Sequence, residues 1–416
     1  MDKRTYSTSS RKQLRLLLLL PFAPRLDIAH GGGRVIAGLL AALAGQHKIA
    51  IVYFRGEDEP PLDENLRAVC DLAEEVIRPW SGRSMGQRWL RNGRLITSLL
   101  RLKPLWATDW ASRAFGERVL SITRRWQPDI IQIEYHVMGQ YLPFLDCCQA
   151  PRVLVEHEPG ARAAPYLKRV HSSAGRLIHR LDKLSWLHYE SGILDKIQAA
   201  VVFTDKDKKD LEAYGLKTRI YKIPFGTRIP NMPFNALGCP PLSLLFVGNF
   251  IHPPNIEAAL RLACNIFPSL AQRYPELELY IVGDQPPPEV RELSREKIFI
   301  TGWVPDLTDY LDRAAVFAAP LYSGGGMRVK ILEALAAGKA IVATPLSIEG
   351  LNLVDSQQIL LAENDAEMVD RIEQLLANPE QRTALAQRAR TWACANLAWD
   401  KSIEAYESLY QELLSA

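Results

Sequence analysis

The chain has 416 residues, with 50 basic and 47 acidic side chains and a formal net charge of +3. Hydrophobic residues make up 48% and charged residues 23%, a balance that excludes a disordered, collagen-like or coiled-coil chain. The small net charge excludes a protein coated in nucleic acid. At about 150 residues per domain, this length predicts two or three domains.

The cysteines and the first apolar run exclude further classes. The six cysteines have no C-x-x-C spacing, so we expect neither a disulfide framework nor a zinc site, and we favour a reducing compartment. The apolar run at 14–22 is far shorter than the ~20 residues that cross a bilayer, and no small-residue cleavage site follows it. We therefore expect a cytoplasmic protein, with a peripheral position on the inner face of the membrane as a variant.

Short apolar runs alternate with amphipathic stretches along the chain. In the first half, strands are expected at 14–20, 49–53, 130–133, 152–156 and 199–203, with a helix at 34–45. The pattern restarts with strands at 244–247, 277–282, 298–300, 316–319 and 340–343 and helices at 256–273 and 328–337. This alternation predicts two successive α/β units, each a parallel sheet flanked by helices.

A segment rich in proline and glycine separates the two halves at 224–241, because prolines break helices and weaken strands. We expect an N-terminal domain at 1–223 and a C-terminal domain at 242–395. A helix at 396–416 needs an apolar surface to cover, and it either crosses back to the N-terminal domain or stays on the C-terminal one.

The most informative motif lies at 320–338, where a strand, a loop with three consecutive glycines and a helix follow one another. Glycines let a backbone approach a ligand closely, and a helix start attracts phosphate. Arg328 and Lys330 add positive charge, whereas Glu333, expected about two turns into the helix, is placed to accept hydrogen bonds from sugar hydroxyls. The motif indicates a nucleotide with both diphosphate and ribose. A tight turn before an exposed charged helix is the alternative.

The stretch Gly324-Gly-Gly-Met-Arg-Val-Lys-Ile-Leu-Glu-Ala334 resembles a branch of the retaining nucleotide-sugar glycosyltransferases of the GT-B fold, family 4 in the sequence-based classification. The resemblance extends to the segments at 223–226, 246–255, 281–284 and 301–304 and so covers nearly the whole chain. It implies two Rossmann-like domains facing each other across a cleft. The C-terminal domain would hold the nucleotide sugar and the N-terminal domain the acceptor.

The resemblance also implies which residues bind the donor. They are Gly32, Gly33, Gly248, Gly283, Trp303, Val304, Gly324, Gly325, Gly326, Met327 and Glu333. From the residues alone, Gly32 and Gly33 indicate a second helix start at which a phosphate could bind. A structural turn is the alternative.

Catalysis is assigned to three residues, His157, Arg328 and Lys330. His157 follows a strand at the sheet edge where α/β folds place their sites, although a histidine at such a position can be purely structural. Glu134 and His136, after the strand at 130–133, are weaker candidates for acceptor contacts.

The sequence departs from the family pattern in two places. The family's E-x7-E motif has its second glutamate at Glu333, but Gly325 occupies the position of the first. The usual Arg and Lys after the first C-terminal strand are absent from 248–255. We infer that Arg328 and Lys330 supply that charge instead.

The stretch from Asp205 to Asp207 has the D-x-D spacing of a metal motif, but it opens a helix directly after a strand. Thr204 and Asp205 suit the N-cap, and Asp207 suits the first turn. We therefore expect no bound metal and no cofactor other than the nucleotide-sugar substrate.

Basic residues and tryptophans gather in the segment 78–125, which has eleven Lys or Arg against two acids and contains or adjoins five of the nine tryptophans. This composition suits an anionic membrane surface. The segment 166–188 adds five basic residues, with leucines at helical spacing. The alternative is a solvated helix face whose apolar side lies in the core. No nucleic-acid motif is recognised.

The predicted function is transfer of a hexose-type sugar from a nucleoside diphosphate sugar to a hydroxyl on a glycan or lipid-linked acceptor, as in polysaccharide biosynthesis. The resemblance implies retention of configuration, and the residues favour a reaction without a metal. A GT-B nucleotide-sugar epimerase is one alternative, and a catalytically silent nucleotide-sugar-binding subunit is another because of Gly325. A nicotinamide-dependent oxidoreductase is least favoured, since the segment 30–34 does not give G-x-G-x-x-G.

Overall fold

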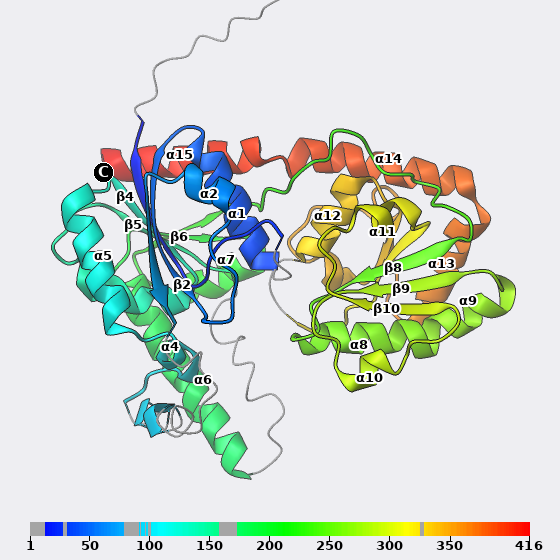
Figure 1. Ribbon diagram of the computed structural model, residues 1–416, viewed down its shortest axis with the longest axis horizontal. Helices are drawn as coiled ribbons and strands as arrows, with labels where there is room; N and C mark the ends of the chain where they lie inside the picture. The colour runs from blue at the N-terminus through cyan, green and yellow to red at the C-terminus, as the bar shows by residue number, and fades with distance from the viewer. Residues whose placement is uncertain are drawn as a thin grey trace, which may run out of the picture.

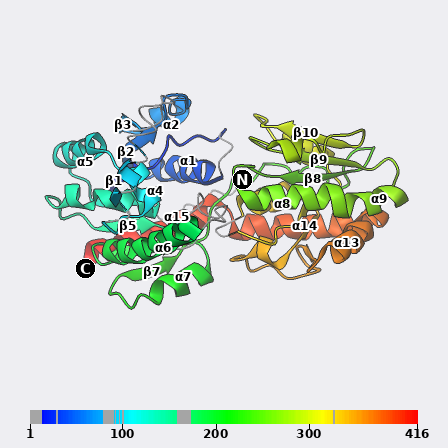
Figure 2. The same ribbon diagram turned by 90° about the horizontal axis from the view of Figure 1, so that it is seen from below.

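The computed structural model describes residues 13–27, 31–78, 91, 93–95, 97–98, 101–157, 173–324 and 328–416. These residues form two parallel sheets, one in each half of the chain, with helices on both faces of each (Figures 1 and 2). The predicted α/β class with two sheets is confirmed. Within this described part of the chain, no helix is both long and apolar enough to cross a membrane.

The N-terminal sheet has the strand order β3-β2-β1-β4-β5-β6-β7, with every neighbouring pair parallel. Its strands are β1 (Arg15–Leu20), β2 (Lys48–Arg55), β3 (Leu72–Ile77), β4 (Ile130–Glu134), β5 (Arg152–Val155), β6 (Ala199–Val202) and β7 (Arg219–Lys222). The central strand β1 is apolar after Arg15 because helices cover both of its faces. The order reverses between β1 and β4.

The helices of this half are α1 (Gly31–Ala44), α2 (Glu64–Ala68), α4 (Leu105–Asp109), α5 (Arg113–Trp126), the 3-10 helix η1 (His136–Leu145), α6 (Ser173–Leu194) and α7 (Asp205–Glu212). Helix α7 begins as predicted: the Thr204 hydroxyl accepts a hydrogen bond from the Asp207 amide. The D-x-D spacing there belongs to a capped helix start.

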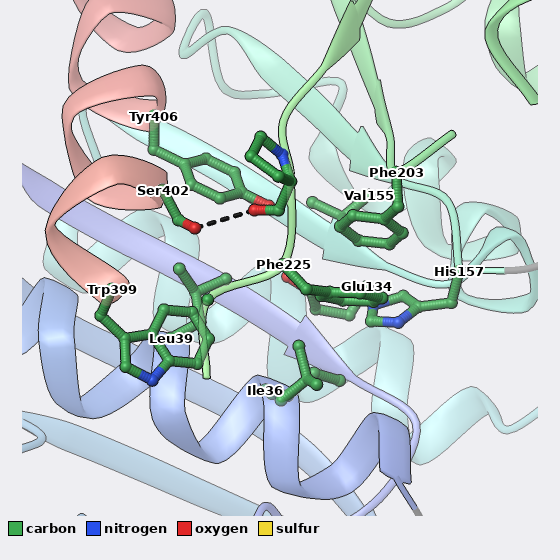
Figure 3. Close-up of a pocket in the computed structure, with 13 residues that line it drawn as sticks. Ile36, Leu39, Glu134, Val155, His157, Phe203, Phe225, Trp399, Ser402 and Tyr406 are labelled. Carbon is green, nitrogen blue, oxygen red and sulfur yellow. Dashed lines mark hydrogen bonds and ion pairs between the residues drawn. The ribbon is translucent and has the colours of Figure 1, made fainter. Parts of the chain in front are cut away.

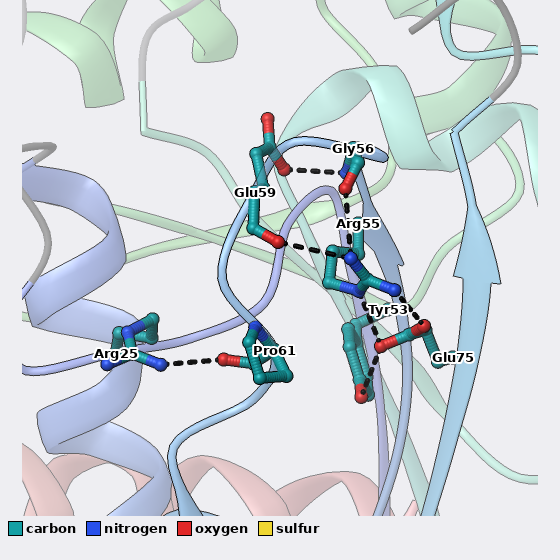
Figure 4. Close-up of polar contacts among 7 residues, drawn as sticks. All are labelled: Arg25, Tyr53, Arg55, Gly56, Glu59, Pro61 and Glu75. Atoms are coloured by element: carbon teal, nitrogen blue, oxygen red, sulfur yellow. Dashed lines mark hydrogen bonds and ion pairs between the residues drawn. The ribbon is translucent and has the colours of Figure 1, made fainter.

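The edge strand β3 was missed by the sequence pattern because its residues Leu-Ala-Glu-Glu-Val-Ile do not alternate. Charges are tolerated at this edge because the neighbouring strand pairs them. Arg55 of β2 donates to Glu75 from Nε and Nη2, each at 2.9 Å, and the Tyr53 hydroxyl donates at 3.2 Å (Figure 4). The hydrogen bonds from Arg55 lower the pKa of the Glu75 carboxyl.

The C-terminal sheet has the order β10-β9-β8-β11-β12-β13, again all parallel. Its strands are β8 (Ser243–Val247), β9 (Glu278–Val282), β10 (Ile298–Gly302), β11 (Val316–Ala319), β12 (Ile341–Ala343) and β13 (Leu360–Leu361). The order reverses between β8 and β11.

The helices around this sheet include the two predicted at 256–273 and 328–337. They are α8 (Pro253–Arg261), a π-helical turn (Leu262–Ile266), α9 (Phe267–Arg273), α10 (Pro288–Arg291), α11 (Thr308–Arg313), α12 (Val329–Ala337), the 3-10 helix η4 (Pro345–Ile348), α13 (Asp365–Ala377) and α14 (Pro379–Asn396). The last helix, α15 (Trp399–Ser415), lies over the N-terminal half instead (Figure 1).

Two crossings join the halves. The first is the segment between β7 and β8, and the second is the junction of α14 with α15, which carries the chain back over the N-terminal half (Figure 1). The Thr227 amide donates to the Leu397 carbonyl at 2.7 Å, so the two crossings lie side by side. The Ser402 hydroxyl of α15 donates to the Pro224 carbonyl at 2.8 Å.

The indole of Trp399 lies between two glycines at this junction. A Cβ atom on Gly38 of α1 would come 2.4 Å from the ring, and one on Gly226 would come within 2.3 Å of it. Side chains cannot occupy these positions unless the indole moves. The missing Cβ atoms let α15 lie directly against α1.

We expect Gly38→Ala to destabilise the protein by about 1–3 kcal/mol, because the added methyl overpacks the α1–α15 contact. Gly192→Ala is the matched control, since Gly192 also lies inside a helix but has no atom within 4 Å of its added Cβ. Gly192→Ala should be neutral or stabilise by up to about 1 kcal/mol. Urea unfolding of both variants measures the difference, and equal stability of the two would contradict this account of the contact.

Candidate functional site

Most of the predicted site residues lie at the carboxyl edges of the two sheets, several of them beside the strand pairs where the order reverses. Ligands of open α/β sheets bind in the crevice at such a point. In the N-terminal sheet the flanking segments are the start of α1 and the stretch 134–136, and in the C-terminal sheet they are Gly248 and the stretch 320–324. Gly32 and Gly33 lie inside the first turn of α1, which begins earlier than predicted.

Helices α1 and α12 begin against each other. A Cβ on Gly31 would lie 3.2 Å from the Val329 side chain. Within about a turn of these starts, Arg34 donates to Glu333 from Nε at 2.9 Å and from Nη2 at 3.2 Å. Both side chains are about a quarter exposed, at 24% and 25%. This two-pronged ion pair spans the two halves of the chain.

The structure corrects the depth of Glu333. Helix α12 begins at Val329, so Glu333 lies just over one turn from the helix start rather than two. Arg328 is the N-cap residue and is 8% exposed. Gly325, Gly326 and Met327 lie outside the described residues.

Lys330 lies half-buried in the first turn of α12. Its Nζ donates to Asn255 Oδ1 at 2.5 Å and lies 4.6 Å from the centre of the Phe246 ring. Burial lowers the pKa of Lys330 to about 7, and the charge of Arg328 lowers it further while Glu333 acts in the opposite direction. Burial and Lys330 likewise lower the pKa of His252.

Arg34, which pairs with Glu333, thus lies with Arg328 and Lys330 at the starts of two helices. Helix starts carry partial positive charge of their own. Positive charge held this closely is costly until an anion compensates it. The arrangement is suited to a polyanionic ligand with hydroxyl groups, such as a nucleoside diphosphate.

Two glycines near this cluster stand where another residue would clash or would strain the backbone. Gly283 has φ of +152°, and a Cβ there would come 1.6 Å from the Gly248 carbonyl oxygen, so only glycine fits. The Gly283 amide donates to the Gly302 carbonyl at 3.0 Å. Gly324 has φ of +109°, which also favours glycine. Trp303, which is 48% exposed, and half-buried Val304 follow β10, two strands away from the crevice.

His157 follows β5 and lines a small cavity between α1, the linker and α15 (Figure 3). Its Nε2 lies 2.7 Å from Glu134 Oε2, and its ring stacks on Tyr135 with 4.0 Å between centroids. The cavity volume is about 10 Å³, room for about one water. His157 is 6% exposed, so the ring is held in place from the protein interior.

A buried hydrogen-bond chain connects α15 to this histidine. The Tyr410 hydroxyl donates to Gln132 Oε1 at 2.5 Å, and Gln132 Nε2 donates to Glu134 Oε1 at 2.5 Å. The other oxygen of Glu134 binds His157. Glu134 is fully buried, so its visible role is to orient His157 rather than to meet an acceptor.

His136 is corrected from a candidate acceptor contact to a core residue. It has no exposed surface, and its Nδ1 lies 2.5 Å from Glu156 Oε1. Its ring packs edge-on against Trp106 and Trp186. A histidine after a strand gives the same sequence signal whether it faces a cleft or a core.

Acidic side chains pair with several arginines of the segment 78–125, so less of its positive charge is uncompensated than its composition suggested. Ion pairs join Arg78 to Glu59, Arg91 to Asp109, and both Arg118 and Arg125 to Glu74. Trp106 packs inward against the core. Among the described residues, no three His, Cys, Asp or Glu side chains come together as a metal site would require.

Solved structures with the same two-domain arrangement define the class. Sucrose-phosphate synthase from Thermosynechococcus elongatus matches 96% of this chain and 99% of its own at a TM-score of 0.70 and 18% identity. Anabaena Alr3699/HepE, solved in complex with UDP and glucose, matches 96% of this chain and 100% of its own at a TM-score of 0.66 and 13% identity. The chain has the GT-B fold.

The sequence comparison concerns the C-terminal half. Residues 241–378 match the family described as glycosyl transferases group 1. Phosphatidyl-myo-inositol mannosyltransferase of Mycolicibacterium smegmatis is 32% identical over 129 residues, 30% of this chain and 31% of that protein. The matches span between 24% and 44% of the length of the curated relatives. The resemblance to GT-B glycosyltransferases is confirmed, whereas assignment to family 4 stays a prediction.

Site residues that the sequence missed are Arg34, which faces Glu333, and Asn255, which binds Lys330. Both lie in motifs that the sequence singled out, at 30–34 and 248–255. Their partners are 299 and 75 positions away, so the signal was the residue type alone.

Proposed function

We propose that this protein is a glycosyltransferase that moves a sugar from a nucleoside diphosphate sugar to a hydroxyl acceptor. The observation that carries the proposal is the grouping of Arg328 and Lys330 with the Arg34–Glu333 ion pair, beside the points where the strand order of each sheet reverses. The matched glycosyltransferase family supports the reaction class. Structures of HepE with UDP and with UDP-glucose support a nucleoside diphosphate sugar as donor.

Glu333 is proposed to accept hydrogen bonds from the ribose hydroxyls. Because Arg34 now holds this carboxylate, the ribose is proposed to take over at least one of its two oxygens from the guanidinium. Arg34 then stays close to the start of α12, where the diphosphate would bind. The donor would thus break one contact between the halves and supply another.

Arg328 and Lys330 are proposed to stabilise the diphosphate as it leaves. The bond from the anomeric carbon to the phosphate oxygen breaks, and the acceptor oxygen bonds to the same face of that carbon. The acceptor proton passes to the leaving phosphate. Cationic side chains and helix starts can stabilise the negative charge that develops.

His157 is proposed to contact the donor sugar, with Glu134 orienting its ring. Because the carboxylate accepts from Nε2, Nδ1 is the ring nitrogen left for a sugar hydroxyl. The donor glycines and Trp303 keep their proposed binding roles along the sheet edge.

The acceptor is proposed to be a glycan or a lipid-linked glycan, as in polysaccharide biosynthesis. The name of the mannosyltransferase relative, which includes phosphatidyl-myo-inositol, supports a lipid-linked acceptor. A lipid-linked acceptor would place the protein at the inner face of a membrane.

Gly325 favours a second candidate, a protein that binds the nucleotide sugar without transferring it, since the first glutamate of E-x7-E is missing there. Product analysis separates the two. Transfer gives a glycosylated acceptor, an epimerase changes the donor alone, and a silent subunit leaves the donor intact.

A thermal-shift screen with nucleoside diphosphates and their sugars tests the proposal directly. A ligand at 100 times its dissociation constant should add ~2.7 kcal/mol of stability. Stabilisation by at least one nucleoside diphosphate, followed by release of that diphosphate when a suitable acceptor is supplied, is the expected result. A flat screen would contradict the donor site.

Turnover is expected to survive EDTA, because the charge of the diphosphate is met by Arg328 and Lys330 rather than by a metal. Initial rates measured with EDTA and with added Mg²⁺ should agree within about twofold, far less than the effect of losing a catalytic metal. Loss of activity with EDTA and its return with Mg²⁺ or Mn²⁺ would overturn the proposed role of these two side chains.

A further inference from the structure

Helix α6 is oriented opposite to the expectation for a solvated helix. The sequence alternative placed its leucines in the core, but Leu177 is 59% exposed and Leu184 is 56% exposed. Ile178, Leu181 and Leu187 are each between 36% and 38% exposed. Large apolar side chains therefore line the outward face of a helix that is 22 residues long.

The opposite face of α6 anchors the helix firmly. Trp186 is 1% exposed and packs edge-on against Trp106. The buried carboxylate of Asp182 accepts a hydrogen bond from the Leu105 amide at 2.8 Å. The inward face of α6 therefore already packs against the N-terminal domain. The exposed leucines form a separate apolar face on the outward side.

The charged side chains that the described part of α6 exposes to solvent are basic. Arg176, His179, Arg180 and Lys183 are exposed beside the leucines. The acids of the described helix, Asp182 and Glu190, are each 1% exposed and lie on the inward face. The described part of α6 thus presents cations and apolar side chains to solvent, while its two carboxylates are buried.

The neighbouring segment adds to this surface. Leu102 is 46% exposed between the exposed residues Arg101 and Lys103. The hydrogen bond from the Leu105 amide to Asp182 holds this segment close to the middle of α6. Arg94, Arg101 and Lys103 also line an open pocket of about 210 Å³ that includes Tyr189 of α6. In Figure 1 the N-terminal end of α6 extends beyond the rest of the domain.

We propose that the outward face of α6, with Leu102 and its flanking cations, docks the protein on an anionic lipid bilayer. The leucines enter the headgroup boundary, and the cations meet lipid phosphates. A protein partner would need an acidic rim around an apolar groove, whereas a bilayer presents both features everywhere. This inference rests on the proposed function only for the membrane location that a lipid-linked acceptor implies. It requires neither donor binding nor turnover.

Cosedimentation of the full chain with vesicles tests the surface. We expect binding to vesicles with equal phosphatidylcholine and phosphatidylglycerol, weaker binding to phosphatidylcholine alone, and less binding at high salt. The double variant Leu177→Glu/Leu184→Glu should lower the partition coefficient at least about tenfold. Arg180→Ser/Lys183→Ser should remove most of the preference for the anionic vesicles.

The matched control is Leu237→Glu/Val354→Glu, which adds the same charge at exposed apolar positions outside the N-terminal sheet unit, 43% and 52% exposed. It should bind vesicles as the wild type does. Circular dichroism and the melting temperature check that each variant is folded. Nucleotide binding, measured without vesicles, should be equal in all of them.

Three results would overturn the proposal: no vesicle binding by the wild type, equal loss in the control variant, or a wild-type dimer that Leu177→Glu/Leu184→Glu converts to monomer without vesicle binding. The last would assign the face to a second copy of the chain. Failure of nucleotide binding with normal vesicle binding would instead count against the proposed function and leave this surface in place.

Discussion

Arg328→Ala should weaken binding of a nucleoside diphosphate by about 1.5–3 kcal/mol and leave binding of the nucleoside unchanged. The loss is that of a charged hydrogen bond made only to the phosphates. Glu333→Gln should weaken nucleoside and diphosphate by the same factor, at least about tenfold, because both carry the ribose. Calorimetry of each variant with nucleoside, monophosphate and diphosphate separates the two patterns.

Arg34→Ala is the third variant in this set, and we expect it to change the affinities for nucleoside and diphosphate in opposite directions. Removing Arg34 frees Glu333, so the nucleoside should bind more tightly, while the diphosphate loses a cation and binds less tightly. If Arg328→Ala costs nucleoside and diphosphate equally, or if Glu333→Gln changes neither, α12 is not the donor site.

Binding of the diphosphate should take up a proton through Lys330. Its pKa is lowered to about 7 in the free protein, so at pH 8 only about one-tenth of it is charged. An anion beside the ammonium group raises this pKa, so the complex holds more protons than the free protein. Affinity should therefore fall as the pH rises above 7, by up to about tenfold per pH unit. The diphosphate itself is already deprotonated in this range.

Calorimetry at pH 8 in two buffers of different ionisation enthalpy counts the protons taken up. Close to one proton is expected for the wild type, and Lys330→Met should abolish the uptake and cost about 1.5–3 kcal/mol of binding. Lys339→Met is the matched control, because burial also lowers the pKa of Lys339, to about 8, but its ammonium group binds the Asn235 carbonyl away from the site. Uptake that persists in Lys330→Met, or disappears in Lys339→Met, would assign the proton to another group.

The regular part of the fold was predictable because buried strands and amphipathic helices carry periodic patterns. The apolar run at 14–20 became β1, and the glycine-rich stretch before Arg328 led into α12. Edge strands such as β3 and β7 were missed because charges are tolerated there and the pattern is weak. The two-residue β13 is too short to carry any pattern.

The site was predictable in its parts but not in its pairings. The residue types at 324–333 pointed to a diphosphate and a ribose, but nothing local could show that Arg34 would reach Glu333 across the two halves. The direction that a helix faces was equally hidden: the leucines of α6 have core-like spacing, yet they lie outward because Asp182 and Trp186 occupy the inward face. Such choices depend on neighbours far away in the chain.

The return of α15 to the N-terminal half also has a consequence during synthesis. The last strand of the N-terminal sheet, β7, ends at Lys222, about 180 residues before α15 begins at Trp399, so at 5–20 residues per second the finished sheet waits roughly 10–35 s for its cover. Throughout that interval the apolar side chains that meet Tyr406 and Tyr410 are open to water or to a chaperone. The N-terminal half therefore reaches its final stability only after the C-terminal half has left the ribosome, and a ribosome stalled before α15 would hold a nascent chain prone to aggregation.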